Sequence, residues 1–167
     1  KYGSYRFKIH FEPSPIANDE EPNDDIHQAK VIEFEKTYTG HLCFAHPDGT
    51  KDSQDWYSFT MPEDGRIHVE VNRYNSYNQK ENFYMEFSSL YTDSTLENYN
   101  TLKFDNKNSN DSIHHYYLNK FAKGTYYFYT TNRYGSSYGD YGFTFYYDTC
   151  DVIDDVEPND EWTQAIE

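Results

Sequence analysis

Basic residues are scarce in this chain of 167 residues, where 14 Lys and Arg stand against 29 Asp and Glu for a formal net charge of −15. A negative field of this size repels phosphate backbones and anionic headgroups, which argues against nucleic acids and membranes as partners. No apolar run reaches the roughly eighteen residues that a membrane-spanning helix needs. The first residues also lack the pattern of a signal peptide, as expected for a chain that starts inside a longer array.

Motifs of catalysis and of transition-metal binding are also missing. The sequence has no phosphate-binding loop and no dinucleotide-binding fingerprint. The stretch from Gly135 to Gly139 has the spacing of a nucleophile elbow, but strands are expected on both sides of it, whereas an elbow leads into a helix. His114 and His115 are adjacent and would point to opposite faces of a strand, and the other histidines are scattered, so we expect no zinc site. The sequence therefore predicts a protein that is not an enzyme.

Cysteine is rare, with Cys43 and Cys150 as the two copies. They are either joined in a disulfide or present as two separate buried thiols, and the sequence leaves both alternatives open.

Aromatic residues are abundant where aliphatic residues are few, with 19 Tyr, 12 Phe and 2 Trp. Rings with one polar edge suit the half-buried surface of a pleated sheet. The composition therefore favours β structure and leaves many tyrosines for the outer surface.

One motif, Asp-x-Glu-Pro-Asn-Asp, occurs twice, at residues 19–24 and 155–160, so that Glu21 and Glu157 lie 136 positions apart. The same offset aligns residues 2–11 with residues 138–147. Similarity held in register over such a length indicates a tandem array. We expect residues 1–15 to be the last strand of a preceding repeat, residues 16–150 to be one complete module, and residues 151–167 to begin the following repeat. Neighbouring repeats of the same chain are then partners.

Alternation of apolar and polar residues predicts many short strands separated by Gly, Asn, Asp and Pro clusters. The expected fold is all-β, an antiparallel β-sandwich resembling a jelly roll, with one short helix near the start of the module. That helix covers residues 25–29 and is capped by Asn23 or Asp24. The predicted strands are residues 5–11, 37–44, 56–61, 66–71, 83–91, 102–105, 113–118, 125–131 and 141–147.

The period of two assigns side chains to the two faces of each strand. The inner sets are Tyr57, Phe59 and Met61; Ile67, Val69 and Val71; Phe83, Met85 and Phe87; Tyr126 and Phe128; Tyr141, Phe143 and Phe145. The outer sets include Trp56 and Ser58, His68 and Glu70, Tyr127 and Tyr129, Thr144 and Tyr146.

Acidic side chains gather in two segments. Residues 19–24 carry carboxylates and an asparagine amide on a stretch that Pro22 biases toward extended backbone, and Asp52 and Asp55 come directly before a predicted strand. Each like-charged pair within a few ångström costs on the order of 1–4 kcal/mol without a cation. Oxygen ligands of these types select hard ions, Ca²⁺ above all, and two such ions would offset four of the five carboxylate charges.

Four motifs, in order along the module, resemble those of the bacterial pre-peptidase C-terminal domain family, which includes the collagen-binding domains of clostridial collagenases. They are Glu21-Pro22-Asn23-Asp24 followed by Gln28-Ala29, Asp52-x-x-Asp55-Trp56-Tyr57-x-Phe59, Gly124-Thr125-Tyr126-Tyr127-x-Tyr129, and Tyr141-x-Phe143. The resemblance implies a calcium-stabilised, non-catalytic β-sandwich of a secreted or surface protein, and hence an extracellular or bacterial cell-surface location.

The calcium ligands that the resemblance implies are Asp19, Glu21, Asn23, Asp24, Asp52 and Asp55. Asp19 stands where the collagen binders carry Glu. The serine ligand expected upstream of Asp52 has no match, which leaves Asp48 or a backbone carbonyl for that role. The alternative is that the first motif only caps a helix while Asp52 and Asp55 are solvated. The second copy, residues 155–160, lacks an Asp-x-x-Asp partner and is expected to be empty or weak.

Two functions compete. In the first, the array presents an aromatic surface to an extracellular polysaccharide or a host protein, because exposed tyrosines stack on sugars or pack on proteins at low entropic cost. In the second, calcium-clamped linkers make the array a stiff spacer without a ligand of its own. The candidate ligand-binding residues are Trp56, Tyr74, Tyr77, Tyr127, Tyr129, Tyr134 and Tyr146.

Overall fold

The computed structural model describes residues 3–11, 13, 16–42, 44, 46–74, 85–91, 99–100, 113–132 and 139–149. Its elements are η1 (Ile26–Gln28), β1 (Lys30–Val31), β2 (Thr37–Leu42), β3 (Gln54–Met61), β4 (Gly65–Tyr74), β5 (Met85–Tyr91), β6 (Tyr99–Asn100), β7 (Ile113–Phe121), β8 (Gly124–Asn132) and β9 (Gly139–Thr149). Within this part of the chain, no helix is long and apolar enough to cross a membrane.

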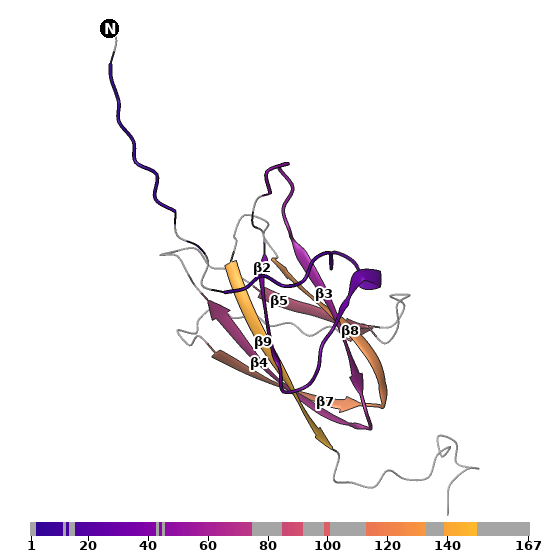
Figure 1. The fold of residues 1–167 in the computed structure, drawn as a ribbon. Coiled ribbons are helices and arrows are strands. Elements are labelled where there is room, and N and C mark those ends of the chain that lie inside the picture. The colour runs from indigo at the N-terminus through magenta and orange to yellow at the C-terminus, as the bar shows by residue number, and fades with distance from the viewer. Residues whose placement is uncertain are drawn as a thin grey trace, which may run out of the picture.

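Two sheets form a β-sandwich (Figure 1). The five-stranded sheet has the order β1-β3-β8-β5-β6, and the four-stranded sheet has the order β2-β9-β4-β7. Strands pair antiparallel except for β1, which lies parallel to β3. The predicted all-β sandwich is therefore confirmed.

The core between the sheets is built mainly from aromatic rings. Phe59 of β3 packs against Phe145 of β9 with ring centroids 5.2 Å apart, and Phe128 of β8 meets Phe143 of β9 at 5.4 Å. Edge-to-face and tilted pairs of this kind add to the free energy of burying the rings. The inner-face assignments that the structure describes hold, since every one of these side chains is buried except the half-buried Tyr126.

The predicted strands over residues 37–44, 56–61, 66–71, 113–118, 125–131 and 141–147 are present with shifted ends, and the described part of the strand predicted at residues 83–91 is β5. The strand predicted at residues 102–105 lies outside the described residues, as do Cys43, Cys150 and the second acidic motif. The short strands β1 and β6 were not predicted, because two residues are too few to show a period.

The strand predicted at residues 5–11 is absent. Residues 3–11 run away from the sandwich without strand hydrogen bonding (Figure 1). The side chains of Tyr5, Phe7, Ile9 and Phe11 are 73–87% exposed. Their counterparts in β9 lie in a strand that pairs on both sides, whereas no described strand pairs with residues 3–11, so the same pattern forms a strand in only one of the two places.

The outward assignment of Trp56, Ser58 and Thr144 is wrong, since all three are buried. The outer face of β3 is covered by the segment that precedes it. Asn23 accepts a backbone hydrogen bond from Trp56 at 2.8 Å, Ser58 accepts one from Ile32 at 2.8 Å, and η1 packs on β3. Thr144 of β9 lies opposite Thr37 of β2, and the two hydroxyl oxygens are 2.9 Å apart.

The predicted helix is a single 3₁₀ turn, η1, and its cap is Asp25. The Asp25 carboxylate accepts a hydrogen bond from the backbone N–H of His27 at 2.8 Å. Neither Asn23 nor Asp24 is the cap. The side chain of Asn23 points elsewhere, into the acidic cluster described next.

Candidate metal centre

The first acidic segment is fixed to the sandwich at both ends. At its start, Thr39 of β2 donates to the Ala17 carbonyl at 2.9 Å, and the backbone N–H of His41 donates to the Asn18 side chain at 2.9 Å. At its end, the Asn23 carbonyl accepts a hydrogen bond from the backbone of β3. Residues 19–23 therefore pass over the beginning of β3, where Asp52 and Asp55 lie.

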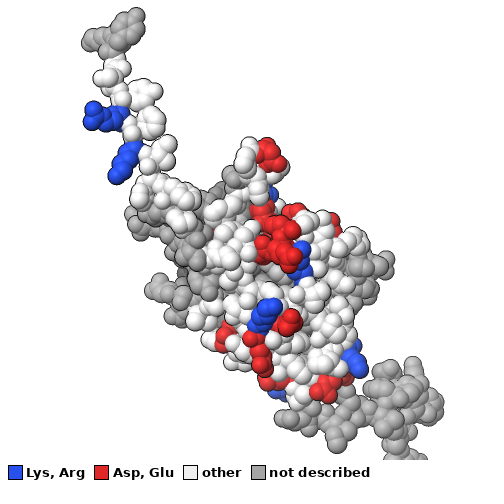
Figure 2. All heavy atoms as spheres, in the orientation of Figure 1, with Lys and Arg blue, Asp and Glu red and all other residues white. Residues whose placement is uncertain are grey.

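Four of the predicted ligands come together there. Asp19, Glu21, Asp52 and Asp55 each offer a carboxylate oxygen, and these oxygens lie within 4.8 Å of one another. Because Ca²⁺–oxygen distances are about 2.3–2.6 Å, two ligands of one ion are separated by at most roughly 5 Å. The four oxygens are thus close enough to share an ion. Figure 2 shows acidic side chains gathered in a compact patch on one face of the molecule.

Hydroxyl groups hold one oxygen of Asp19 and one oxygen of Asp55. Tyr57 donates to Oδ2 of Asp19 at 3.0 Å, while Tyr141 and Thr130 donate to Oδ2 of Asp55 at 2.5 and 3.2 Å. Tyr57 and Tyr141 also contact each other through their hydroxyl oxygens at 2.5 Å. Hydrogen bonds from rigid, buried phenols fix the direction of each carboxylate.

The other oxygens have no partner. Oδ1 of Asp19, Asp52 and Asp55 and Oδ1 of Asn23 are buried without a hydrogen bond. In the described part of the chain, no Lys or Arg side chain pairs with any of the four carboxylates. Buried acceptors without donors are costly, whereas a cation would be coordinated by all of them. The donor set therefore fits a calcium ion.

Asn23 contributes an amide rather than a charge. Its side chain is fully buried, its Nδ2 donates to Oδ2 of Asp19 at 2.5 Å, and its Oδ1 stays available. The backbone N–H of Asn23 donates to the Glu21 carboxylate at 3.2 Å. Asn23 thus orients both Asp19 and Glu21.

Asp24 and Asp48 lie outside the group. Asp24 is exposed. Burial is the main cause that raises the pKa of Glu21 and of Asp52, and the charge of Asp24 adds to it. Asp48 is exposed and accepts two hydrogen bonds from Thr50 at 2.9 and 2.7 Å, which engages Oδ1 in a turn. Asp48 is therefore not placed to replace the missing serine.

The pKa values of the cluster reflect crowding of like charge. Burial, with the charges of Asp19 and Asp52, raises the pKa of Asp55 to about 9. Desolvation of the Glu21 carboxylate, with the charges of Asp52 and Asp19, raises its pKa to about 7 although the residue as a whole is exposed. Burial also raises the pKa of Asp52. Without a cation, the cluster therefore retains protons at neutral pH.

Gly40 makes room for this arrangement. It lies opposite Tyr141 in the pairing of β2 with β9, and a Cβ at position 40 would overlap the Tyr141 phenol. Burial, with the charges of Tyr57 and Asp55, raises the pKa of Tyr141 further above its ordinary value. Tyr141 therefore stays protonated and remains a donor to Asp55.

Sequence reasoning did not assign Tyr57, Tyr141 and Thr130 to the site. The alternation placed Tyr57 and Tyr141 on inner faces, and a buried tyrosine hydroxyl needs a hydrogen-bond partner. That need was the available signal. The pairing of β3 with β8 places Thr130 opposite Asp55, whereas Tyr141 of β9 meets Asp55 of β3 across the two sheets.

The predicted aromatic surface is only partly present. Trp56 is buried and packs against Tyr129 with ring centroids 4.8 Å apart, so it is not a surface residue. Tyr127, Tyr129 and Tyr146 are half-buried. The side chain of Tyr74 and the whole of Tyr77 and Tyr134 lie outside the described residues.

No family model and no curated protein matches the chain. Among solved structures, the chain is similar to the pre-peptidase C-terminal domain of a collagenase from Bacillus anthracis, with 18% identity and a TM-score of 0.47. The match covers 76% of this chain and 99% of that domain. The collagenase domain bears the name of the family whose motifs the sequence resembles.

Proposed function

We propose that the chain is a non-catalytic, calcium-binding β-sandwich module of an extracellular or cell-surface protein. The observation that carries the proposal is the set of buried side-chain oxygens of Asp19, Asn23, Asp52 and Asp55 that have no hydrogen-bond donor. Glu21 adds a carboxylate at the exposed side. Bound calcium would neutralise charges that the fold otherwise holds together at a cost.

Calcium binding is tested by calorimetric titration of chelator-treated protein and by thermal unfolding in Ca²⁺ and in EDTA. At a free concentration about 100 times Kd, binding to the folded state adds about 2.7 kcal/mol. For a protein of this size, that corresponds to a rise in Tm of roughly 5–10 °C. Equal melting temperatures in Ca²⁺ and EDTA would overturn the proposal.

A matched pair of variants locates the ion. Asp55→Asn removes a buried ligand charge and is expected to weaken calcium binding at least about tenfold. Asp148→Asn removes an exposed carboxylate at the end of β9 and should leave calcium binding unchanged. Equal affinities in the two variants would place the ion elsewhere.

The proposed role of the module is binding of an extracellular polysaccharide or a host protein. The described residues that support a binding surface are Tyr127 and Tyr129, which share one face of β8 and are both half-buried. Screening against glycans and collagen, followed by Tyr127→Ala, tests this role. Uniformly negative screens with the calcium-loaded protein would exclude it.

A spacer without a ligand is the second candidate. It is supported by the attachment of residues 16–19, because Thr39 and His41 bind this segment directly before it supplies Asp19 to the cluster. An ion shared between residues 19–21 and residues 52–55 would fix the direction in which the chain enters the module. Calcium-dependent extension of a protein with two modules would favour the spacer.

A further inference from the structure

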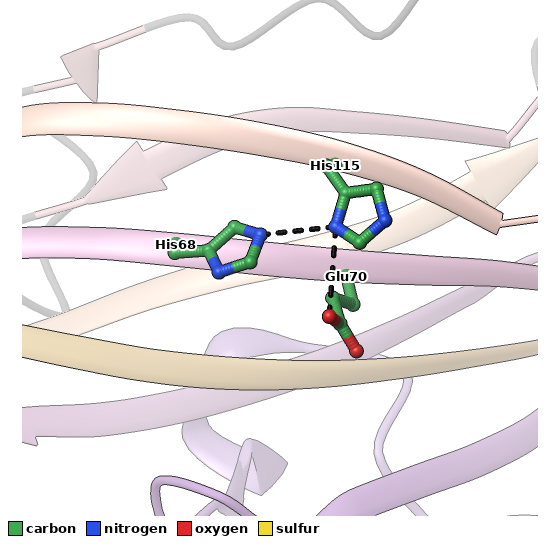
Figure 3. A group of neighbouring side chains, drawn as sticks. All are labelled: His68, Glu70 and His115. Atoms are coloured by element: carbon green, nitrogen blue, oxygen red, sulfur yellow. Dashed lines mark hydrogen bonds and ion pairs between the residues drawn. The ribbon is translucent and has the colours of Figure 1, made fainter.

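A second group of metal-ligating side chains lies on the outer face of the four-stranded sheet. His68 and Glu70 of β4 share this face, because the residues that alternate with them, Ile67, Val69 and Val71, are buried in the core. His115 of β7 is the direct cross-strand partner of Glu70. Figure 3 shows the three side chains converging, with His68 and Glu70 on one strand and His115 on its neighbour.

Two of the three distances between the ligand atoms are close to those around a tetrahedral ion. Nε2 of His68 lies 3.1 Å from Nδ1 of His115, which lies 3.5 Å from Oε1 of Glu70. Zinc bonds to nitrogen and oxygen of about 2.0–2.2 Å at tetrahedral angles separate neighbouring ligands by roughly 3.3–3.5 Å. All three atoms lie within 4.8 Å of one another.

Hydrogen bonds alone cannot satisfy all three ligand atoms at once. If Nδ1 of His115 accepts a hydrogen bond from His68, it presents a lone pair to the Glu70 carboxylate. If Nδ1 of His115 carries a proton, that proton can form a good hydrogen bond to Glu70 or to His68, but not to both. A cation among the three atoms would be coordinated by a lone pair from each.

Neighbouring rings already hold the ligands in place. The His68 ring stacks on Tyr117 of β7 at 4.5 Å and on Tyr146 of β9 at 5.3 Å. The Tyr146 hydroxyl donates to Oε2 of Glu70 at 3.1 Å, which leaves Oε1 facing His115. Hydrogen bonds from such outer residues orient metal ligands and strengthen metal binding.

We propose that His68, Glu70 and His115 form a surface site for Zn²⁺ or a similar divalent transition-metal ion. Two imidazoles favour such ions over Ca²⁺, which prefers oxygen. The site is accessible, since the side chain of His115 is 50% exposed and that of Glu70 is 29% exposed. Three protein ligands leave a fourth position for water or for a donor from another molecule. The sequence predicted no zinc site, because His68 and His115 are 47 residues apart and only the pairing of β4 with β7 joins them.

The experiment is a calorimetric titration of the folded chain with Zn²⁺ in the presence of excess Ca²⁺, which keeps the acidic cluster occupied. We expect a saturable site that His115→Ala weakens at least about tenfold. Glu70→Gln should also weaken it, although the amide oxygen introduced there can still accept a hydrogen bond from Tyr146. The control is His46→Ala, which removes an exposed histidine from a turn and should leave Zn²⁺ affinity unchanged.

NMR of the unmodified protein tests the site without relying on the folding of a variant. Zn²⁺ should shift the ring resonances of His68 and His115 in NMR spectra and leave those of His46 unchanged. The proposal is overturned if Zn²⁺ does not bind, if binding persists in His115→Ala, or if the histidine resonances that move belong elsewhere. The resonance readout does not depend on whether the acidic cluster binds calcium, because that cluster contains no histidine.

Discussion

At the scale of single residues, the acidic cluster is an arrangement of charge that the fold maintains against repulsion. Asp55 is fully buried beside Asp52 and Asp19, with Tyr141 and Thr130 as its donors. A phenol and a threonine hydroxyl do not neutralise a carboxylate. Protons or a cation must do so, and the two compete for the same oxygens.

This competition predicts an unusual dependence of stability on pH in the metal-free protein. The pKa of Asp55 in the folded state is raised to about 9, so the folded state binds this proton more tightly than the unfolded state. The stabilising contribution is therefore complete below the unfolded pKa of about 4 and is lost as the pH rises toward 9. In EDTA, we expect Tm to fall between pH 5 and pH 8, as measured by circular dichroism.

Asp55→Asn is the matched variant for this prediction, since it removes the charge and keeps an oxygen for Tyr141. In EDTA at pH 8, the variant should melt a few degrees above the unmodified protein, and in saturating Ca²⁺ it should melt below it. A variant that is less stable in both conditions would contradict the raised pKa.

The second prediction at this scale concerns Gly40. Gly40→Ala places a methyl group into the Tyr141 phenol, and overpacking of this kind costs about 1–3 kcal/mol. Because Tyr141 is the donor to Asp55, we also expect weaker calcium binding by calorimetry. Gly65→Ala is the control, since its Cβ would meet Tyr147 and the Asp148 carbonyl, away from the cluster. It should lower Tm without changing the calcium affinity.

At the scale of elements, the sandwich is closed by connections that cross between the sheets. Residues 62–64 lead from β3 to β4, and residues 122–123 lead from β7 to β8. The backbone N–H of Lys123 donates to the Asp64 side chain at 2.6 Å, which ties the two connections together. This end of the sandwich is thus held by a contact between its two connections, whereas the acidic cluster holds the segment before η1 to β3.

Residues 3–11 illustrate how context decides whether a pattern forms a strand. They carry the same alternation as residues 139–147, yet their aromatic and aliphatic side chains are exposed. Since these residues add little buried area in the described structure, deletion of residues 1–11 should leave Tm within about 1 °C of the full chain. A large drop in Tm, measured at low protein concentration, would show that the segment packs on the sandwich.

At the scale of the whole molecule, the repeated motif and the net charge of −15 act together. We propose that residues 16–150 are one module of a tandem array whose linkers carry the calcium ligands of each following module. Acidic modules in series repel one another, which favours extended arrangements at low ionic strength. Calcium would reduce the charge at each junction and fix its direction.

The prediction for the array uses a protein with two complete modules. Small-angle scattering should give a larger maximum dimension and less flexibility in Ca²⁺ than in EDTA. The same protein with Asp19→Asn and Asp55→Asn in each module should show no such difference. A dimension that is insensitive to Ca²⁺ in the unmodified protein would contradict the clamped linker.

Local sequence patterns are enough to predict the β architecture, most strand positions and the residues of the acidic cluster. Alternation with period two and turn residues are local properties, and Asp19, Glu21, Asn23, Asp52 and Asp55 occur in short motifs that local spacing reveals. The burial of side chains on the outer face of β3 could not be predicted from a local pattern. It depends on residues 23–32, which cover Trp56 and Ser58.

Which groups share a site follows from the tertiary structure and not from local patterns. Tyr141 reaches Asp55 across 86 residues of sequence and from one sheet to the other, and His68 reaches His115 across 47 residues through the pairing of β4 with β7. The tertiary structure also separated Asp24 and Asp48 from the acidic cluster, although both are near the motifs in sequence. The physical reason is that coordination and hydrogen bonding depend on distances of a few ångström, which are set by the register of strands far apart in the chain.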